Sequence, residues 1–252
     1  MRRLITAGLL LASAQAGALE LNALKSKLNE LTQPSAPTTG APAKSGLEQF
    51  SAQDQVSSLK QALTQGAETA VSTLARKDGY LGNSKVHIPL PDNLLKVDKT
   101  LRRFGMGKYS DELITSMNRA AEAAVPEAKA LLIGAITSMT VTDAKNILTG
   151  GDDAATRYFR GSTEGALSGK FKPIVGNAMR DVQLATAYNR FAGAGAKYGL
   201  LDKRDAQLDD YITRKALDGL FLMMAEQEKA IRDNPLQATG DLAKKIFAAL
   251  RP

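Results

Sequence analysis

Apolar residues recur every three or four positions along most of the chain after residue 51, which is the spacing of one face of an α-helix. No segment alternates apolar and polar residues in the way that a half-buried β-strand requires. Helix-start signals show where single helices begin within this pattern. Ser51 with Asp54 and Thr140 with Asp143 have the spacing of capping boxes. The pattern therefore predicts an all-α domain over residues 47–251.

Further helix boundaries are predicted from residues with known positional preferences. We expect Ser110 and Asp152 to cap the helices that follow them and Pro173 to lie in the first turn of another helix. Gly150-Gly151 is expected to end a short helix just before Asp152. Residues 79–91 are expected to form a loop, since they include two prolines that disfavour helix in the residues before them.

One expected helix, over about residues 209–232, differs from the others in being apolar on almost all sides of its middle. A helix of this kind is usually buried at the centre of a domain. We therefore expect a single, bundle-like, multi-helix domain arranged around it. A glycine-containing connection over residues 193–207 precedes this helix, and an amphipathic helix over residues 242–250 ends the pattern.

The start of the chain has the organisation of a secretory signal peptide. Arg2 and Arg3 precede an apolar run over residues 4–14, and residues 16–18 have the small-x-small pattern of a signal-peptidase site. The run is too short for a stable membrane anchor, which needs about 20 apolar residues. We expect a signal peptide over residues 1–18, cleaved after Ala18, and export to the periplasm of a double-membrane bacterium.

Residues 19–46 are predicted to be a flexible tether. Leucines at positions 21, 24, 28 and 31 make an amphipathic segment of about three turns, which is too short to be stable alone. Residues 32–46 are rich in proline, serine, threonine, glycine and alanine and have no apolar periodicity, as is typical of a linker.

The composition excludes several kinds of structural and catalytic site. The chain has no cysteine and a single histidine, His87, so it has no disulfide, no Cys/His zinc site and no cysteine nucleophile. His87 is expected to be an ordinary loop residue, and the S-x-x-K spacing of Ser57 and Lys60 is expected to be incidental, because its usual companion motifs are missing. No metal site and no cofactor is expected.

The formal net charge is +7, with basic and acidic residues interspersed rather than in blocks. Nucleic acid is not expected as a partner of an exported protein. An anionic lipid or glycan surface remains open as a partner.

A basic stripe is the first candidate contact surface. Lys96, Lys99 and Arg103 fall on one side of a helix whose apolar positions are 94, 95, 97, 101 and 104. The stripe is interpreted as a solvated face, and the alternative is contact with anionic headgroups or polysaccharide.

Asn118, Arg119 and Glu122 form a second candidate group on one expected helix. Arg119 and Glu122 are three residues apart and either pair on the surface or turn inward, where Arg119 would organise a neighbouring helix end or loop. A structural role of either kind is favoured over ligand binding.

The third candidate group is Asp152, Asp153 and Arg157, which follow two glycines. We favour a helix stop followed by a helix start, with Asp153 and Arg157 as an i,i+4 ion pair. The alternative is a small ion or polar-ligand site built on the two carboxylates.

Six short blocks of this sequence occur together at residues 78–80, 88–91, 117–122, 125–129, 150–156 and 216–221. With these blocks the chain resembles the bacterial exported family catalogued as Domain of Unknown Function 4197, from about Ser51 to Leu250. The resemblance implies an exported helical domain with no assigned activity, and it offers no catalytic residues.

The sequence thus predicts an exported binding or accessory module without catalysis of its own. The alternative is a periplasmic carrier of a lipid or another apolar ligand, motivated by the methionine-rich central helix. A hydrolase is the third and least favoured hypothesis. A large internal apolar pocket would favour the carrier, whereas a solid core with an exposed apolar groove would favour the module that binds a partner.

Overall fold

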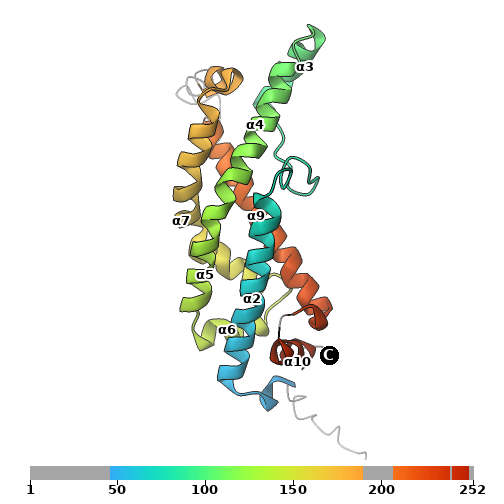
Figure 1. The fold of residues 1–252 in the computed structure, drawn as a ribbon, viewed down its shortest axis with the longest axis vertical. Coiled ribbons are helices and arrows are strands. Elements are labelled where there is room, and N and C mark those ends of the chain that lie inside the picture. The colour runs from blue at the N-terminus through green and yellow to red at the C-terminus, as the bar shows by residue number, and fades with distance from the viewer. Residues whose placement is uncertain (1–45, 190–206, 239, 250–252) are drawn as a thin grey trace, which may run out of the picture. The chain divides into compact units, whose positions relative to one another are not determined.

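The structure is a computed structural model that describes residues 46–189, 207–238 and 240–249. Within these ranges the chain is helical and contains no β-strand, which confirms the expected all-α fold (Figure 1). The expected signal peptide, the tether and nearly all of the connection over 193–207 lie outside the described residues. The principal helices are α2 (Ala52–Ala75), α3 (Asp92–Arg103), α4 (Lys108–Ala124), α5 (Ala128–Ser138), α6 (Val141–Leu148), α7 (Ala154–Met179), α9 (Leu208–Asp233) and α10 (Asp241–Ala249).

Shorter helical turns join these elements. In the described part of the chain three of them are 3₁₀ helices, η1 (Gly46–Gln49), η2 (Val125–Glu127) and η4 (Pro235–Gln237), and residues 183–189 are also helical. Pro126 lies in η2, between α4 and α5, where its fixed φ suits the first turn of a helix.

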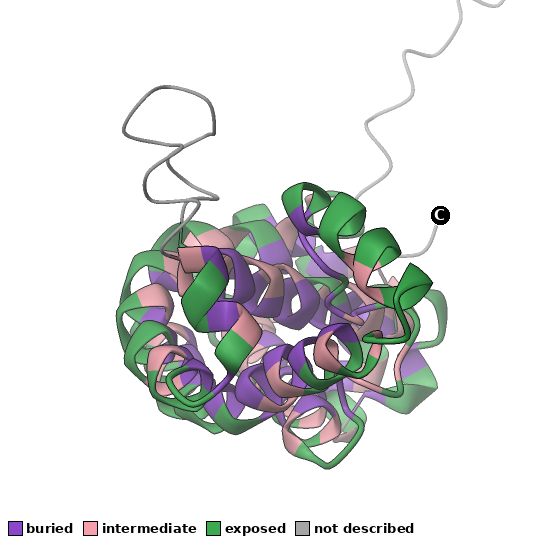
Figure 2. Ribbon diagram, turned by 90° about the horizontal axis from the view of Figure 1, so that it is seen from above, coloured by how far each residue is buried: buried purple, intermediate pink, exposed green. Residues whose placement is uncertain are grey.

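Helix α9 is the centre of the bundle, as the sequence predicts. It packs most extensively against α7 and α2, and it also contacts α4 and α10. Leu220 and Phe221 are almost completely buried, whereas Leu222 is 42% exposed, so one side of the helix reaches solvent. Figure 2 shows the buried positions gathered on the inward faces of the helices. Replacing a core aromatic such as Phe221 by alanine typically costs about 3–5 kcal/mol of stability.

Two expected capping interactions are present. The N–H of Asp54 donates to the Ser51 hydroxyl at 3.0 Å at the start of α2. At the start of α6, the N–H of Asp143 donates to the Thr140 hydroxyl at 3.1 Å, and the Thr140 N–H donates to the Asp143 carboxylate at 3.0 Å. These contacts satisfy backbone donors that have no partner inside the helix.

The expected cap at Ser110 is wrong. Helix α4 begins at Lys108 with Gly107 as its N-cap, so Ser110 lies inside the first turn. Its hydroxyl is buried and has no hydrogen-bond partner among the described residues. The helix starts earlier because the turn after α3, which includes Gly105 at a φ of +72°, has already reversed the chain.

The expected helix start at Pro173 is also wrong, because α7 runs without interruption through this residue. A proline inside a helix removes one hydrogen bond and costs about 3 kcal/mol. Phe171, Val175 and Met179 lie around it and are buried. Burial of these side chains offsets the local penalty and keeps the helix continuous.

Helix α3 and the first turns of α4 form a hairpin that extends beyond the rest of the bundle (Figure 1). Helix α3 packs chiefly against α4. Within α3, all of which the structure describes, Leu94 alone is buried. The hairpin is therefore attached to the core through one end of α3 and through α4.

Within the described residues, no single helix combines the length and the apolar composition of a membrane span. The stretch Lys108–Ser138 and helix α6, bent by 103°, meet those criteria as a pair.

Candidate functional site

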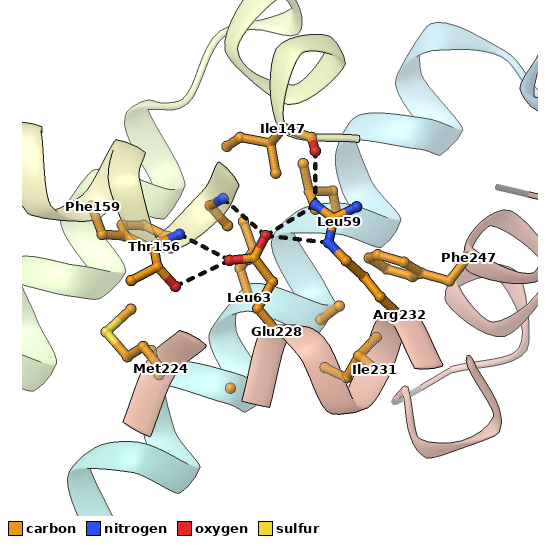
Figure 3. A pocket seen from close by; sticks show the side chains of 14 residues that line it. Leu59, Leu63, Ile147, Thr156, Phe159, Met224, Glu228, Ile231, Arg232 and Phe247 are labelled. Carbon is orange, nitrogen blue, oxygen red and sulfur yellow. Dashed lines mark hydrogen bonds and ion pairs between the residues drawn. The ribbon is translucent and has the colours of Figure 1, made fainter. Parts of the chain in front are cut away.

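A narrow pocket opens between α2, α7 and α9, with α6 and α10 at its edge (Figure 3). Its volume is about 30 Å³, which is room for about one or two water molecules. Sites for drug-sized ligands usually measure about 300 Å³ or more. The apolar part of the lining includes Leu59, Leu63, Phe159, Met224, Ile231 and Phe247. The pocket is therefore a narrow gap between core side chains.

Glu228 lies at the polar end of this pocket and is almost completely buried (Figure 3). Its carboxylate accepts hydrogen bonds from the N–H groups of Ala155 and Thr156, each at 3.0 Å, and from the Thr156 hydroxyl at 3.0 Å. Arg232 donates to the same carboxylate at 2.9 Å and to the carbonyl of Ile147 at 2.8 Å. Glu228 and Arg232 thus join the start of α7 to the end of α6.

Asp152 does not cap α7, so this expectation is wrong. The N-cap residue is Asp153, and its side chain makes no capping hydrogen bond. Asp152 instead lies 3.4 Å from the Lys229 ammonium group on the surface. The N–H groups at the start of α7 are taken by Glu228 from α9, which satisfies them and places a negative charge at the positive end of the helix.

The Asp153–Arg157 ion pair is present, as the i,i+4 spacing predicts. The block over residues 150–156 is therefore a helix stop followed by a helix start. Within the described ranges, no three Asp, Glu or His side chains are grouped in a way that could hold a metal ion. A carbon added at Gly150 would lie 2.6 Å from the Ala154 side chain, so the turn before α7 needs glycine at this position.

Asn118 holds the loop that precedes α3. Its buried amide accepts a hydrogen bond from the N–H of Ile88 at 2.9 Å and donates to the carbonyl of the same residue at 2.9 Å. The side chain thus pairs with Ile88 much as a neighbouring strand would pair with it. Farther along the loop, the Tyr211 hydroxyl donates to the carbonyl of Pro89 at 3.0 Å.

Glu122 holds the start of the same loop. Its buried carboxylate accepts hydrogen bonds from the N–H groups of Tyr80 and Leu81, at 3.0 and 3.1 Å. Arg119 donates to Glu122 at 2.6 Å and to Asp78 at 2.7 Å. The pair of Arg119 and Glu122 is present, but Glu122 is buried rather than on the surface, and its carboxylate, more than the Arg119 guanidinium, organises the loop.

Tyr80 anchors this loop in the core. Its hydroxyl donates to the carbonyl of Ala216 at 2.6 Å. Burial, with a smaller effect of the nearby Glu122 charge, raises the pKa of Tyr80 well above its usual range. The ring also lies against Gly219, where an added carbon would be 2.8 Å from the Tyr80 ring. The blocks over 78–80 and 216–221 therefore meet in space and have a packing role.

The residues considered for hydrolytic chemistry have other contacts. The Ser57 hydroxyl donates to the carbonyl of Asp54 at 3.3 Å, and the Lys60 ammonium donates to the carbonyl of Thr137 at 2.7 Å. His87 is partly buried in the loop, and its backbone N–H donates to the carbonyl of Asn83. None of these contacts joins a nucleophile to a base.

The sequence analysis did not identify Glu228 or Arg232 as candidate residues. Their i,i+4 spacing is the one local signal of a relationship, and pairs at this spacing are common on exposed helix faces. The partners that make Glu228 important lie 72 and 73 positions earlier in the chain. No local pattern could have pointed to them.

The end of the α3–α4 hairpin, residues 99–108, is here called the hairpin tip. Phe104 is 70% exposed and Met106 is 42% exposed, and both lie in the turn between the two helices. Four basic residues surround them, Lys99, Arg102, Arg103 and Lys108, and the tip contains no acidic residue.

The expected basic stripe leads into the hairpin tip. Lys96, Lys99 and Arg103 are all exposed. Leu94 and the partly buried Leu101 lie on the opposite side of α3. The structure thus brings the basic stripe next to two exposed apolar side chains, a combination that the sequence did not predict.

Two larger hollows are open grooves on the surface, of about 540 and 510 Å³. The first lies along α2 and includes Lys129, which pairs with Glu68 at 3.0 Å. The second lies along α7 and includes Lys172, which pairs with Asp210 at 2.6 Å. Both grooves are lined mainly by polar side chains, without exposed aromatic or methionine side chains like Phe104 and Met106 of the hairpin tip.

Comparison with known proteins identifies one family. A family model described as "Protein of unknown function (DUF4197)" matches residues 49–248. No curated protein and no solved structure matches this chain.

Proposed function

This chain belongs to the DUF4197 family of proteins of unknown function, and on that premise we propose that it is a non-catalytic binding module whose contact site is the hairpin tip. The exposure of Phe104 carries this proposal. An aromatic side chain that is 70% exposed, at the end of a hairpin that extends from the bundle, has no role in the core of this domain. Grouped apolar side chains that are exposed and rimmed by polar residues mark interaction surfaces, and Met106, 42% exposed, lies in the same turn as Phe104.

The hydrogen bonds that the two buried carboxylates accept support a role without catalysis. Glu122 and Glu228 each accept hydrogen bonds from two successive backbone N–H groups and from an arginine. Catalytic carboxylates need access to a substrate. In this chain both are used to fix a loop or a helix end.

The small volume of the core pocket favours the binding module over a carrier. A carrier of a lipid would need an apolar cavity that encloses most of its ligand. The pocket beside Glu228 has room for about one or two water molecules. The methionine side chains that motivated the carrier hypothesis, Met223 and Met224, are packed into the core.

The proposal includes export of the chain. Its support is the order of charged, apolar and small residues over positions 1–18. N-terminal sequencing of the protein from its native compartment should begin at Leu19. Recovery of the protein with Met1 still in place, as the dominant form in the cytoplasm, would refute this part of the proposal.

A photo-crosslinking amino acid tests the contact site itself. We would place p-benzoylphenylalanine at position 104 and, as the control, at position 236, where Leu236 is 77% exposed in η4. Irradiation of living cells should give adducts from position 104 but not from position 236. Equal adduct yields from both positions, or none from either, would overturn the proposed contact site.

A further inference from the structure

We propose that the partner of the hairpin tip is a bilayer surface rich in anionic lipids. This inference rests on the proposed function, because it names the partner of the same tip. It follows from three properties of the tip: its charge, the apolar side chains in its turn and its place at the end of the hairpin.

The charge of the tip complements an anionic surface. Lys99, Arg103 and Lys108 are exposed, and Lys96 continues the same positive side along α3. Arg102 is held by Asp98 at 2.8 Å and by Asp111 at 2.5 Å, so these two acidic side chains are paired with it. The remaining basic groups thus lie together at one end of the molecule. Clusters of lysine and arginine of this kind bind anionic headgroups.

The apolar side chains of the tip lie where they would enter a bilayer interface. Phe104 and Met106 are separated by Gly105, whose φ of +72° makes the tight turn. A carbon added at Gly105 would have no neighbour within 4 Å among the described residues, so this side of the turn is open. Aromatic and apolar side chains surrounded by basic ones are characteristic of segments that bind the headgroup boundary.

The position of the hairpin allows this contact without any other described helix in the way. Helix α3 and the start of α4 extend beyond the ends of their neighbours (Figure 1). Phe104 can therefore reach a flat surface before the core helices do. An acidic protein would also complement the charge, but a projecting turn is suited to entering a fluid interface, whereas protein hot-spot residues usually fill shaped pockets.

Substitutions at the tip should leave the fold intact. Phe104 and Met106 are exposed, and they lie outside the cluster of buried apolar side chains. Loss of binding in tip variants can therefore be separated from unfolding by comparing their melting temperatures with that of the wild type.

The test is co-sedimentation of the processed protein, purified from cells that express the whole chain, with vesicles of two compositions. We expect binding to mixed phosphatidylglycerol and phosphatidylcholine, little binding to phosphatidylcholine alone, and loss of binding at high salt. The double variant K99Q/R103Q should bind about thirtyfold more weakly. The double variant F104S/M106S should bind at least about tenfold more weakly, whereas Leu236→Ser should bind as the wild type does.

The outcomes distinguish this inference from the proposed function. Equal binding to both vesicle compositions, or wild-type binding by either double variant, would overturn the lipid inference. If vesicles do not bind while position 104 crosslinks to a protein in cells, the lipid inference fails and the binding module stands. If vesicles do not bind and position 104 gives no adduct, both proposals fail.

Discussion

The carboxylate of Glu228 accepts hydrogen bonds from both the backbone N–H and the hydroxyl of Thr156, each at 3.0 Å. The two residues are 72 positions apart in the chain, on α9 and at the start of α7. The carboxylate of Glu122 likewise accepts hydrogen bonds from the backbone N–H groups of Tyr80 and Leu81, 42 and 41 positions earlier in the chain. In both places a buried carboxylate from a core helix fixes the backbone of a segment that is distant in sequence, and an arginine on the same helix neutralises the charge.

Removal of Glu228 should destabilise the protein strongly. Glu228→Ala leaves Arg232, whose side chain is 13% exposed, without its carboxylate and leaves the N–H groups of Ala155 and Thr156 unsatisfied. Loss of one partner of a buried pair typically costs about 3–5 kcal/mol. The free energy of unfolding in urea measures this loss.

Asp152→Ala is the matched control, because it removes a second carboxylate beside the same helix start. Asp152 makes an exposed contact with Lys229, so its loss should change stability by less than about 0.5 kcal/mol. If Asp152→Ala costs as much as Glu228→Ala, then Glu228 is not the principal cap of α7.

A methyl group at position 219 should disturb the contact between α9 and the loop. In Gly219→Ala the added carbon would lie 2.8 Å from the Tyr80 ring and 3.1 Å from the Cβ of Val86. Overpacking of this kind costs about 1–3 kcal/mol. Gly134→Ala is the control, since an added carbon there meets nothing within 4 Å and should stabilise α5 by up to about 1 kcal/mol. If both variants are destabilised, the loss of stability in Gly219→Ala cannot be assigned to the contact with Tyr80 and Val86, because alanine then destabilises a helix without such a contact as well.

Stability should fall in alkali because of Tyr80. Burial raises the pKa of this phenol in the folded protein, whereas a tyrosine in the unfolded chain ionises near pH 10. The unfolded chain therefore loses its proton first as pH rises. The stability contributed by the neutral phenol is fully present below about pH 10 and is lost above it.

Tyr80→Phe tests this linkage through urea unfolding at about pH 9 and about pH 11. The variant should lose about 1 kcal/mol at neutral pH, because the hydrogen bond to Ala216 is absent. Its stability should then fall less than that of the wild type between the two alkaline pH values. An identical fall in Tyr80→Phe and wild type would exclude Tyr80 as the source.

The sequence predicted those parts of the fold that depend on neighbours in the chain. Capping at Ser51 and Thr140 depends on residues three positions away, so both starts were predicted correctly. The cap of α7 was predicted wrongly, because the side chain that accepts hydrogen bonds from its first N–H groups, Glu228, comes from a different helix. Pro173 was misplaced for a related reason, since the burial of Phe171 and Val175 that keeps α7 continuous is a tertiary effect.

For the candidate site too, the sequence predicted the feature that depends on neighbours in the chain and missed the one that depends on tertiary packing. The basic stripe of Lys96, Lys99 and Arg103 follows from spacing along one helix and was found in the sequence. The exposure of Phe104 was not found, because an apolar residue at helical spacing normally indicates a buried position. In the structure α3 has mainly α4 to pack against, so the apolar residues at its end are left in solvent.

A single tryptophan tests the central claim most directly. The chain contains no tryptophan, so Phe104→Trp places the one indole of the protein in the hairpin tip, and Leu236→Trp is the control at another exposed site. With vesicles of phosphatidylglycerol and phosphatidylcholine, the emission of Phe104→Trp should shift to shorter wavelength and be quenched by lipids brominated on their acyl chains. The emission of Leu236→Trp should not change. An unchanged spectrum for Phe104→Trp, or equal quenching at both positions, would contradict insertion of the hairpin tip into an anionic membrane surface.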